Sequence, residues 1–270
     1  VYLILLYVDS TVLLIVLTNK MRFLDLKVND AYTNMATDEV LTKSKGEGGP
    51  DTLRFYRWTP SAVTLGYFQS VEDEVDLDAL EKYGIDLNRR ISGGGAVLNS
   101  AEGEITYSIV MDEEDPRISD DPTESYRYLC HGIIEGLAIL GIKADFKPIN
   151  DIIVGPKKIS GNAQIRRYGA VLHHGTILVD FDAKQMFSVL KISDTKISDK
   201  LIKQANERVT TIRQVLDRKV SFEEVRAAME KGFAKALGVE LVKGELSPHE
   251  EELVGEFREK YASREWRFRR

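Results

Sequence analysis

Cysteine is almost missing from this sequence, since Cys130 is the single cysteine among 270 residues. One thiol cannot close an internal disulfide, and it cannot build a zinc site of the cysteine-rich kind, so both classes of protein are excluded. Sparse cysteine is typical of proteins that stay in a reducing compartment. We therefore expect a cytoplasmic protein.

An excess of positive charge is also missing from this sequence. The sequence holds 37 lysines and arginines against 43 aspartates and glutamates, a formal net charge of -6. Broad nucleic-acid binding requires a basic surface, so we expect no nucleic-acid partner. An acidic protein that handles an anionic substrate has to gather its cations locally. The pairs that could do so are Arg89-Arg90, Lys157-Lys158 and Arg166-Arg167.

The first twenty residues carry no recognisable targeting signal. Residues 1–17 are apolar and rich in β-branched side chains, but they lack a basic start and a small-residue cleavage site, unlike a signal peptide. Asp9 at their midpoint argues against a membrane-spanning helix, and we expect no membrane association. Met21 then opens a clear strand pattern. We interpret residues 1–20 as an extension foreign to the natural protein, with a hydrophobic anchor as the alternative, and residues 21–270 as one domain.

Hydrophobic periodicity predicts strands in the first half of the chain and helices in the second. Alternating apolar positions predict strands over residues 23–28, 53–58, 62–67, 86–90 and 104–110. We expect the second and third of these to pair across a turn at residues 59–61. Helical signals are found over residues 31–42 and 75–83, after Asp121-Pro122, and after capping patterns at Ser221 and Ser247. This order favours an α+β fold, with mixed β-sheets surrounded by helices.

The stretch 150–179 contains the strongest candidate for chemistry. Its alternation predicts two strands joined by a turn at Tyr168-Gly169. On the first of these strands Lys158 is followed by Ser160 and Gly161, small residues whose backbone a ligand can approach closely. A lysine held on a hairpin can meet the same anionic atom at every turnover. The alternative, for one lysine taken alone, is an ordinary solvated side chain.

Three consecutive glycines, Gly93 to Gly95, form the second candidate. They follow a predicted strand that ends in Arg90, and they precede the strand-like Ala96-Val97-Leu98. Glycines free the backbone to curl and to aim several N–H groups at one point, which suits a phosphate or a carboxylate. The pattern is neither a Walker loop nor the dinucleotide-binding G-x-G-x-x-G, because Leu98 stands where the last glycine is required. A flexible linker is the alternative, but the strands on both sides favour a shaped turn.

Two pairs of adjacent residues could bind a metal ion. Asn150-Asp151 offers oxygen ligands of the kind that Mg²⁺ prefers next to phosphates, although a simple turn would use the same residues. His173-His174 invites comparison with a zinc site, but neighbouring residues on a strand point to opposite faces. We expect one histidine to face the site and the other to be packed or solvated, without zinc. Cys130 falls on the apolar face of the helix after Asp121, where a buried thiol is normally inert.

Four motifs occur in a fixed order: Arg90-x-x-Gly-Gly-Gly-Ala-Val, Asn150-Asp151, Lys-Ile-Ser-Gly-Asn-Ala-Gln from Lys158, and His-His-Gly-Thr-Ile-Leu from His173. In this order they resemble the lipoate–protein ligase A family, over residues 23–218. The resemblance implies the catalytic-domain fold that this family shares with biotin–protein ligases and octanoyltransferases. It also implies an enzyme that joins lipoic acid to a lysine of a lipoyl domain, with ATP and Mg²⁺ as cofactors.

The resemblance also implies roles for single residues. In this family lipoate attacks ATP to give lipoyl-AMP and pyrophosphate, and the lysine amine then displaces AMP. By resemblance Lys158 is the catalytic ammonium that stabilises the negative charge of both steps, and Asp151 holds Mg²⁺. Contacts with lipoyl-AMP are implied for a larger set: Arg90, Gly93, Gly94, Gly95, Ala96, Val97, Asn150, Ser160, Gly161, Ala163, His173, Gly175, Thr176 and Tyr67.

The sequence departs from the family in its length. Little chain remains after the helix predicted from Ser247, so it resembles the single-domain archaeal form, which lacks the C-terminal accessory domain and works with a separate small accessory protein. The expected partners are therefore lipoic acid, this accessory protein, and the lipoyl domains of 2-oxoacid dehydrogenases and of the glycine cleavage H protein.

A second departure concerns the reaction itself. The run from Gly103 to Ser108 (Gly-Glu-Ile-Thr-Tyr-Ser) resembles the octanoyltransferase branch, which uses a cysteine nucleophile near the position of Asn150-Asp151. No cysteine lies there, and we therefore favour the ATP-dependent ligase. Two alternatives stay open. One is an ATP-independent octanoyl or lipoyl acyltransferase, and the other is a non-catalytic protein that binds lipoyl-AMP or a biotin-type ligand.

Overall fold

The computed structural model describes residues 2–8, 11–17, 19–191 and 199–269, and the chain is built around one large sheet. Its strands are β3 (Asn19–Asn29), β4 (Thr52–Trp58), β8 (Glu104–Asp112), β9 (Asp145–Lys147), β10 (Asp151–Val154), β11 (Lys157–Arg167), β12 (Ala170–Leu178) and β13 (Val239–Lys243). The eight strands lie in the order β13-β3-β4-β8-β12-β11-β10-β9. β3 pairs parallel with β13 and β4, and the remaining pairs are antiparallel.

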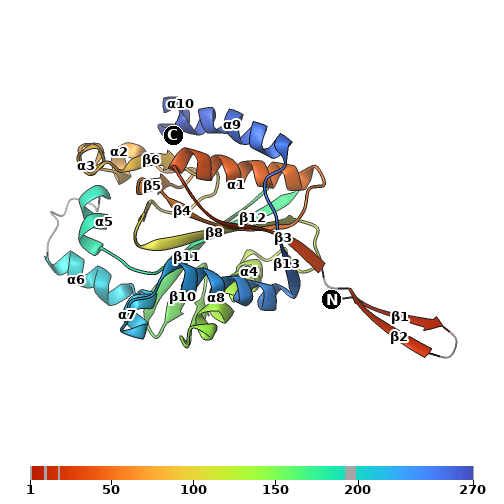
Figure 1. Cartoon of the computed structure of the whole chain (residues 1–270). Coiled ribbons are helices and arrows are strands. Elements are labelled where there is room, and N and C mark those ends of the chain that lie inside the picture. Colours follow the sequence, from red (N-terminus) through yellow and green to blue (C-terminus); the bar gives the residue numbers. More distant parts are fainter. Residues whose placement is uncertain (1, 9–10, 18, 192–198, 270) are drawn as a thin grey trace.

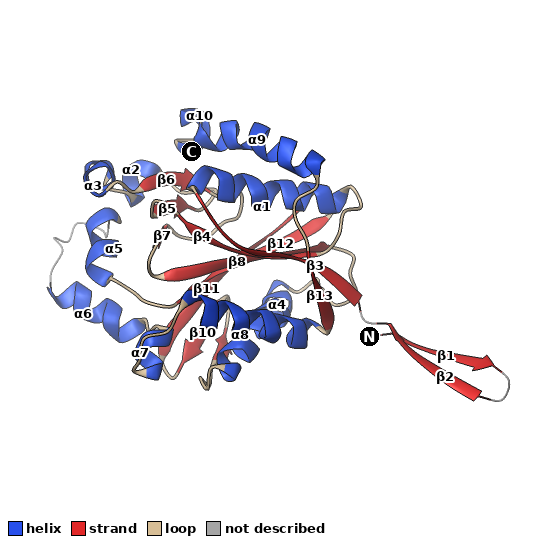
Figure 2. Ribbon diagram, viewed as in Figure 1, coloured by secondary structure: helices blue, strands red, loops and turns tan. Residues whose placement is uncertain are grey.

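Helices cover both faces of this sheet (Figures 1 and 2). On one face α1 (Ala31–Gly46) packs against α9 (Pro248–Ala262), and on the other α4 (Pro122–Ile139) packs against α8 (Phe222–Leu237). The predicted α+β fold, with mixed sheets surrounded by helices, is thus confirmed. The other helices are α2 (Val71–Glu74), α3 (Leu77–Tyr83), α5 (Ala183–Val189), α6 (Asp199–Arg208), α7 (Ile212–Leu216) and α10 (Arg264–Arg267).

A smaller sheet of three strands lies beside α1 and contacts it through β6. It consists of β6 (Asp86–Arg89), β5 (Ala62–Leu65) and β7 (Val97–Asn99), with β5 in the middle. The predicted pairing of residues 53–58 with residues 62–67 is therefore wrong. β4 already has partners on both edges, β3 and β8, so β5 finds no free edge there and pairs with β6 and β7. Because the glycine triplet joins β6 to β7, this sheet positions the glycine loop.

The hairpin of β11 and β12 has the form that the sequence predicts. Tyr168 and Gly169 have φ angles of 60° and 75°, and they join strands that pair from Arg167 and Ala170 onward. Positive φ at two successive residues is the geometry that two-residue hairpin turns favour. β12 also pairs with β8, and β11 also pairs with β10. The strand that carries Lys158 is thus held on both edges.

Most of the predicted helix starts are confirmed. The side chains of Asp121 and Ser221 cap α4 and α8, and at Ser247 both hydrogen bonds of the capping box are formed. One prediction differs in its boundary. The helix expected over residues 75–83 begins only after Asp76, whose side chain caps α3.

The N-terminal strands β1 (Tyr2–Val8) and β2 (Thr11–Leu17) pair with each other in a sheet of their own, which projects from the body of the fold in Figure 1. β3 begins at Asn19, and its pairing with β13 includes Asn19 and Lys20. The last two residues of the segment interpreted as an extension therefore belong to the main sheet.

Among the described residues, no helix has the length and apolar character that a membrane span requires.

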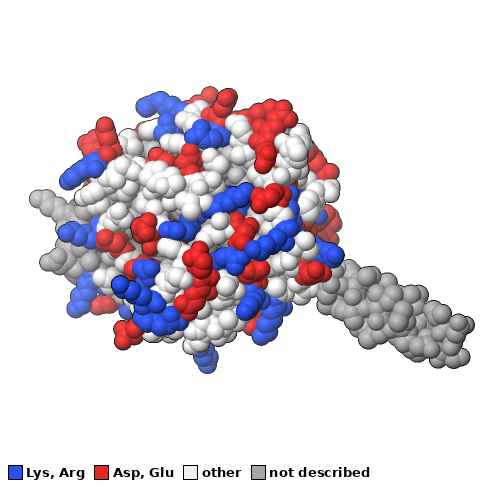
Figure 3. All heavy atoms as spheres, in the orientation of Figure 1, with Lys and Arg blue, Asp and Glu red and all other residues white. Residues whose placement is uncertain are grey.

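The surface carries both signs of charge. On the face shown in Figure 3, lysine and arginine side chains are interspersed with aspartate and glutamate. Ion pairs between elements include Arg226 with Asp25 and Lys235 with Glu135. The face in Figure 3 therefore shows no surface of a single positive sign for an anionic substrate.

The main core lies between the large sheet and the pair α4–α8. It contains Cys130, which is fully buried, as its position on the helix predicts. The two helices approach closely at glycines, since a Cβ atom on Gly232 would lie 2.3 Å from the backbone nitrogen of Gly136. No such atom fits at that distance, so this helix crossing requires glycine.

Gly232→Ala is expected to force α8 away from α4 and to lower the free energy of unfolding by about 1–3 kcal/mol, the range found for overpacked cores. Urea unfolding followed by circular dichroism measures the change. Gly255→Ala on α9 is the matched control, because a Cβ atom there meets nothing within 4 Å. Alanine should leave that helix as stable or stabilise it by up to about 1 kcal/mol. Equal stability of Gly232→Ala and wild type would contradict the close crossing.

Candidate active site

A cavity of about 380 Å³ lies between the large sheet, the glycine loop and the segment around α5. This volume falls within the range of small-molecule pockets. One part of the lining is apolar and includes Trp58, Leu178 and Phe181. The other part carries polar side chains from β7, β8, β11 and β12. The cavity thus suits a ligand with an apolar chain and a polar end.

Most of the predicted substrate contacts lie in this cavity. Its lining includes Arg90, Gly94, Gly95, Ala96, Val97, Asn150, Lys158, Gly161, Ala163, Gly175 and Thr176. Motifs that are far apart in the sequence are thus brought to one place. The predicted residues that do not line the cavity are Gly93, Ser160, Tyr67, Asp151 and His173.

His173 lies in the core and not in the cavity. Of the two adjacent histidines, His174 is the one that lines the cavity. Successive residues of a strand face opposite sides of the sheet, and here the α4 side receives His173. Its Nε2 atom lies 2.8 Å from the hydroxyl of Tyr107 and 3.6 Å from the Sγ atom of Cys130. Burial lowers the pKa of His173 to about 3, so the ring is neutral. Tyr67 is likewise placed elsewhere, with its ring against that of Trp266.

Lys158 enters the cavity from β11 with the help of a bulge. The register between β10 and β11 shifts so that Ile159, which is buried in the core, becomes an extra residue. The Nζ atom of Lys158 lies 2.6 Å from Oδ1 of Asp151, and the lysine side chain is 40% exposed. The carboxylate therefore holds the ammonium in place, while part of the lysine remains open to a ligand.

Glycines in both hairpin motifs make room for a neighbouring side chain. A Cβ atom on Gly161 would lie 2.6 Å from Nζ of Lys158, and one on Gly175 would lie 2.0 Å from Oδ1 of Asn162. Lys158 thus lies across Gly161. Asn162 lies across Gly175 and accepts a hydrogen bond of 2.7 Å from the hydroxyl of Tyr107. The position of each glycine is explained by the side chain that passes over it.

Arg90 shapes the glycine loop from within. Its guanidinium donates to the carbonyl oxygens of Gly93, Gly95 and Thr64, at 2.9, 2.7 and 2.9 Å. Gly94 has a φ of +100°, a conformation that glycine adopts without strain. In the described part of the chain, the N–H groups of the three glycines donate to no protein acceptor. The loop therefore gives its carbonyl groups to Arg90 and has N–H groups left for a ligand.

The arginine pair does not act as the predicted cluster of cations. Arg89 is fully buried and donates to the carbonyl oxygens of Gly66 and Gln69. Burial lowers the pKa of Arg90 to about 10, so this side chain stays charged at neutral pH. Both arginines hold loop backbone, and Lys158 is the cation with an open side.

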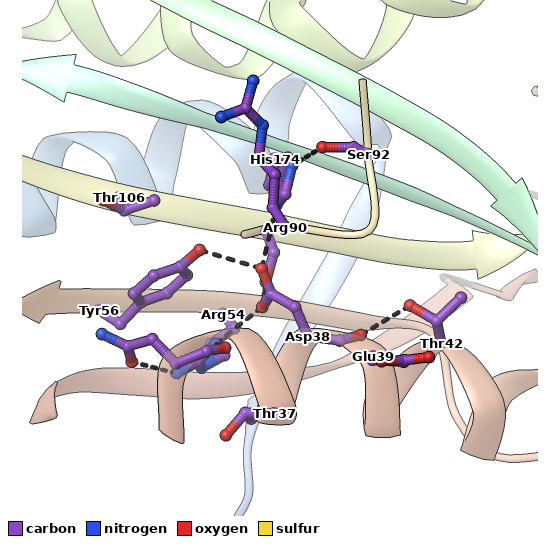
Figure 4. A network of polar contacts seen from close by, with 12 residues as sticks. Thr37, Asp38, Glu39, Thr42, Arg54, Tyr56, Arg90, Ser92, Thr106 and His174 are labelled. Carbon is purple, nitrogen blue, oxygen red and sulfur yellow. Dashed lines mark hydrogen bonds and ion pairs between the residues drawn. The ribbon is translucent and has the colours of Figure 1, made fainter. Parts of the chain in front are cut away.

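A buried carboxylate on α1 connects the site to the fold (Figure 4). Asp38 accepts a hydrogen bond of 2.7 Å from Arg54. The hydroxyl groups of Tyr56 and Ser108 donate to it at 3.0 and 2.8 Å. Burial alone would raise the pKa of Asp38, but the hydrogen bond with His174 and the charge of Arg54 outweigh it, so the pKa is lowered. The carboxylate is therefore ionised.

His174 extends this network to the glycine loop. Its Nδ1 atom lies 3.1 Å from Asp38, and its Nε2 atom lies 2.7 Å from Oγ of Ser92, the residue before the glycines. A proton on Nδ1 satisfies the carboxylate and leaves Nε2 to accept from the Ser92 hydroxyl. Both ring nitrogens are thus engaged, and the ring fixes where the loop begins.

Glu104 is a buried carboxylic acid in the cavity lining. It is 1% exposed, and its Oε1 atom accepts a hydrogen bond of 3.0 Å from Thr106. Thr106 in turn accepts one of 2.7 Å from the indole of Trp58. Burial raises the pKa of Glu104 to about 8, so the acid is mostly neutral at pH 7.

The donor set does not fit a resident metal ion. The described residues contain no group of three or more histidine, cysteine, aspartate or glutamate side chains that could hold one. Asp151, the predicted Mg²⁺ ligand, is ion-paired with Lys158. The expected use of ATP and Mg²⁺ stays a prediction.

The sequence did not point to Asp38 or Glu104 as members of the site, and it indicated His174 only as one of two adjacent histidines. For Glu104 a signal was present, because Glu104, Thr106 and Ser108 alternate along β8 with apolar residues, and all three are buried. A strand that is apolar on one face and polar on the other, yet buried throughout, borders a polar interior.

Comparison with known proteins now defines the class. Residues 30–234 match the lipoyl protein ligase A/B catalytic domain, and the chain belongs to this family. It is 34% identical to octanoyltransferase LipM of Clostridioides difficile, over 93% of this chain and 100% of that protein. It is 35% identical to octanoyltransferase LipM of Geobacillus kaustophilus, over 92% and 98%. Among solved structures, the bi-partite lipoate protein ligase of the archaeon Thermoplasma acidophilum matches with a TM-score of 0.83 and 35% identity, over 93% and 96%.

These relatives confirm the predicted family and fold, and they correct the predicted reaction. The ATP-dependent, adenylate-forming ligase is contradicted, because the octanoyltransferases match almost the whole chain over their own full length. The solved ligase, at a similar identity, shows the family and the fold that both kinds of enzyme share. The prediction rested on the missing cysteine near Asn150-Asp151. A cysteine is needed only when the acyl group is held covalently on the enzyme. The absence of a cysteine therefore excludes transfer through an acyl-cysteine intermediate, but it does not exclude direct transfer. The octanoyltransferases are bacterial and the solved ligase is archaeal, so the expected archaeal character is not confirmed.

Asp38→Asn should destabilise the protein strongly, because it leaves the buried Arg54 without its counter-charge. We expect the free energy of unfolding to fall by about 3–5 kcal/mol, as for other broken buried ion pairs. Urea unfolding measures it. Glu245→Gln serves as the control, since its ion pair with Lys27 is exposed, and a loss of at most about 1 kcal/mol is expected there. Similar losses in the two variants would show that the Asp38 network does not carry the fold.

Proposed function

We propose that this protein is an ATP-independent acyltransferase, which moves an octanoyl group from a thioester donor to the side-chain amine of a lysine on a lipoyl domain. Transfer without ATP requires a donor whose acyl group is already activated, and a thioester meets this requirement. The octanoyl group is supported by the names of the relatives. The lipoyl-domain acceptor is supported by the Thermoplasma acidophilum ligase, which is described together with its E2 lipoyl domain.

The observation that carries the proposal is the meeting of an apolar space with fixed positive groups in one cavity. In this proposal the acyl chain occupies the apolar part of the cavity, which Trp58 and Leu178 line. Its carbonyl group is then directed to the polar part, where Lys158 and the glycine loop line the same cavity. When the amine attacks, this oxygen gains negative charge. A cation and hydrogen-bond donors that are already in place stabilise that charge without reorganisation.

The acyl group passes directly from donor to acceptor. The carbon–nitrogen bond forms, the carbon–sulfur bond breaks, and the donor leaves as a thiol. Cys130 does not take part, because it is fully buried in the core between the sheet and α4, and burial raises the pKa of its thiol far above neutral pH. An inert thiol in that place cannot act as a nucleophile.

Lys158→Ala should lower the rate of transfer by about 10²–10³-fold, the usual effect of removing one group that stabilises an oxyanion. The assay combines an octanoyl thioester with a purified lipoyl domain, and mass spectrometry follows the acylated domain. Omission of ATP and Mg²⁺ is expected to leave the wild-type rate unchanged. Lys157→Ala is the control and should stay close to wild type, because that ammonium donates to the carbonyl of Asn206.

Two outcomes of this assay would overturn the proposal. A strict requirement for ATP would exclude a transferase that takes its acyl group from a thioester. Binding of the donor without any transfer, unchanged by Lys158→Ala, would support a non-catalytic binding protein instead.

Cys130→Ala should retain full transfer activity, since the thiol is fully buried in the core and does not line the cavity. Intact-protein mass spectrometry of wild type incubated with the donor alone should show no added octanoyl group. An octanoyl adduct that disappears in Cys130→Ala, together with the activity, would refute direct transfer. A thermal unfolding curve of the variant confirms that the fold is kept.

A further inference from the structure

The cavity opens to solvent at its polar part. Gly94 and Gly95 line the cavity and are exposed, and Lys158, which also lines it, has a side chain that is 40% exposed. A cavity of about 380 Å³ admits the side chain of an acceptor lysine, whereas a folded domain is far too large to enter. The domain that carries this lysine therefore has to rest on the surface around the opening.

The two most exposed large apolar side chains of the described residues lie beside this opening. Phe68 is 84% exposed and Ile149 is 65% exposed. Phe68 belongs to the turn after β5, and a Cβ atom on Gly66 of that turn would lie 1.9 Å from the carbonyl oxygen of Gly94. Two residues of chain span at most about 7 Å, so Phe68 is close to the glycine loop. Ile149 directly precedes Asn150, which lines the cavity. The two side chains thus belong to different walls of the cavity.

The backbone that carries Phe68 is fixed from inside the fold. The buried guanidinium of Arg89 donates to the carbonyl oxygens of Gly66, Tyr67 and Gln69, at 2.9, 3.2 and 2.7 Å. The ring of Tyr67 lies edge-on to that of Phe68, with centroids 5.0 Å apart. An aromatic side chain on a fixed backbone has little freedom to lose when a partner covers it. Such side chains often contribute most of the binding energy of an interface.

The backbone next to Ile149 is fixed as well. The side-chain amide of Asn150 donates to the carbonyl oxygen of Asn162 at 2.6 Å, and the side-chain amide of Asn162 donates to that of Asn150 at 2.9 Å. The backbone N–H of Asn162 donates to the same oxygen at 3.1 Å. This double contact ties the chain after Ile149 to β11, the strand that carries Lys158.

Each exposed apolar side chain has an unpaired cation near it. The guanidinium of Arg269 lies 4.6 Å from the ring centroid of Tyr67, which contacts Phe68, and Lys147 stands two residues before Ile149. Both cations are exposed, and in the described part of the chain neither forms an ion pair. The acidic helix α2 follows on the Phe68 side, so the positive charge is confined to these two groups. They fit a partner with carboxylates at matching positions.

On the basis of the proposed transferase function, we propose that Phe68 and Ile149 form the docking surface for the lipoyl domain. The domain covers both side chains with apolar residues and directs carboxylates toward Arg269 and Lys147. Its lysine side chain passes through the opening to the carbonyl group of the donor. The surface sets how tightly the acceptor binds, and the chemical step takes place inside the cavity.

The test titrates a fluorescently labelled lipoyl domain with wild type, Phe68→Ser and Ile149→Ser, followed by fluorescence anisotropy. Each substitution should raise the dissociation constant about 10-fold or more, as for central residues of protein interfaces. In the transfer assay the KM for the lipoyl domain should rise similarly, while kcat and the affinity for the octanoyl thioester stay close to wild type. Thermal unfolding should be unchanged, because both side chains are exposed.

Val242→Ser is the matched control. Val242 is 41% exposed and lies on β13, at the edge of the large sheet that is farthest from β9 and β10. This variant should bind and acylate the lipoyl domain like wild type. A loss of affinity as large as that of Phe68→Ser would show that any exposed apolar side chain has this effect, and it would overturn the docking surface.

Arg269→Ala tests the charge of the surface. Removal of this cation should raise the dissociation constant about 2–5-fold at low salt, the range for an exposed ion pair. The difference from wild type should shrink as salt screens the charges. Wild-type affinity of Arg269→Ala at low salt would overturn the assignment of a carboxylate partner to this arginine.

The docking surface and the proposed function fail in different ways. If wild type acylates the lipoyl domain, and Phe68→Ser and Ile149→Ser bind it equally well, the domain docks elsewhere while the transferase stands. Sedimentation of the enzyme alone should show no dimer that Phe68→Ser dissociates, since such a dimer would assign the surface to a second copy of the chain. If wild type neither binds nor acylates the lipoyl domain, the proposed function itself is wrong.

Discussion

The carboxylate of Asp38 is the constraint on which the site depends. It ties α1 to three strands of the large sheet, through Arg54 on β4, Ser108 on β8 and His174 on β12. A buried charge is tolerated only when its hydrogen bonds and counter-charge are in place, so these elements cannot shift independently. Because His174 continues to Ser92, the same carboxylate also fixes the start of the glycine loop. The two walls of the cavity are therefore set in one mutual position before any ligand binds.

Features that depend on neighbouring residues could be predicted from the sequence. The turn at Tyr168-Gly169 and the helix caps at Asp121 and Ser247 follow from local chemistry, and all three are confirmed. The pairing of β5 could not be predicted, because it depends on whether β4 has a free edge, which distant strands decide. Alternation likewise shows that two adjacent histidines face opposite ways. It does not show which face α4 covers.

The reaction was harder to infer than the family. Four ordered motifs identified the family because each is a local pattern, and the structure brings them to one cavity. The choice between ligase and transferase was made on a missing cysteine, and that choice was wrong. The missing cysteine argues only against an acyl-cysteine intermediate. A lysine held beside an apolar cavity is compatible with several acyl donors, both an acyl-adenylate and a thioester. The run from Gly103 to Ser108 was the better indication, since its resemblance to the octanoyltransferase branch agrees with the relatives found.

The hydrogen bonds from Arg90 decide which groups of the glycine loop are left for a ligand. Because the arginine takes the carbonyl oxygens of Gly93 and Gly95, these two acceptors are occupied, whereas the N–H groups of the loop have no protein acceptor in the described part of the chain. A loop in this state is suited to bind a carbonyl or carboxylate oxygen and not an amine. The position of a single side chain thus sets the polarity of the partner that the loop can accept.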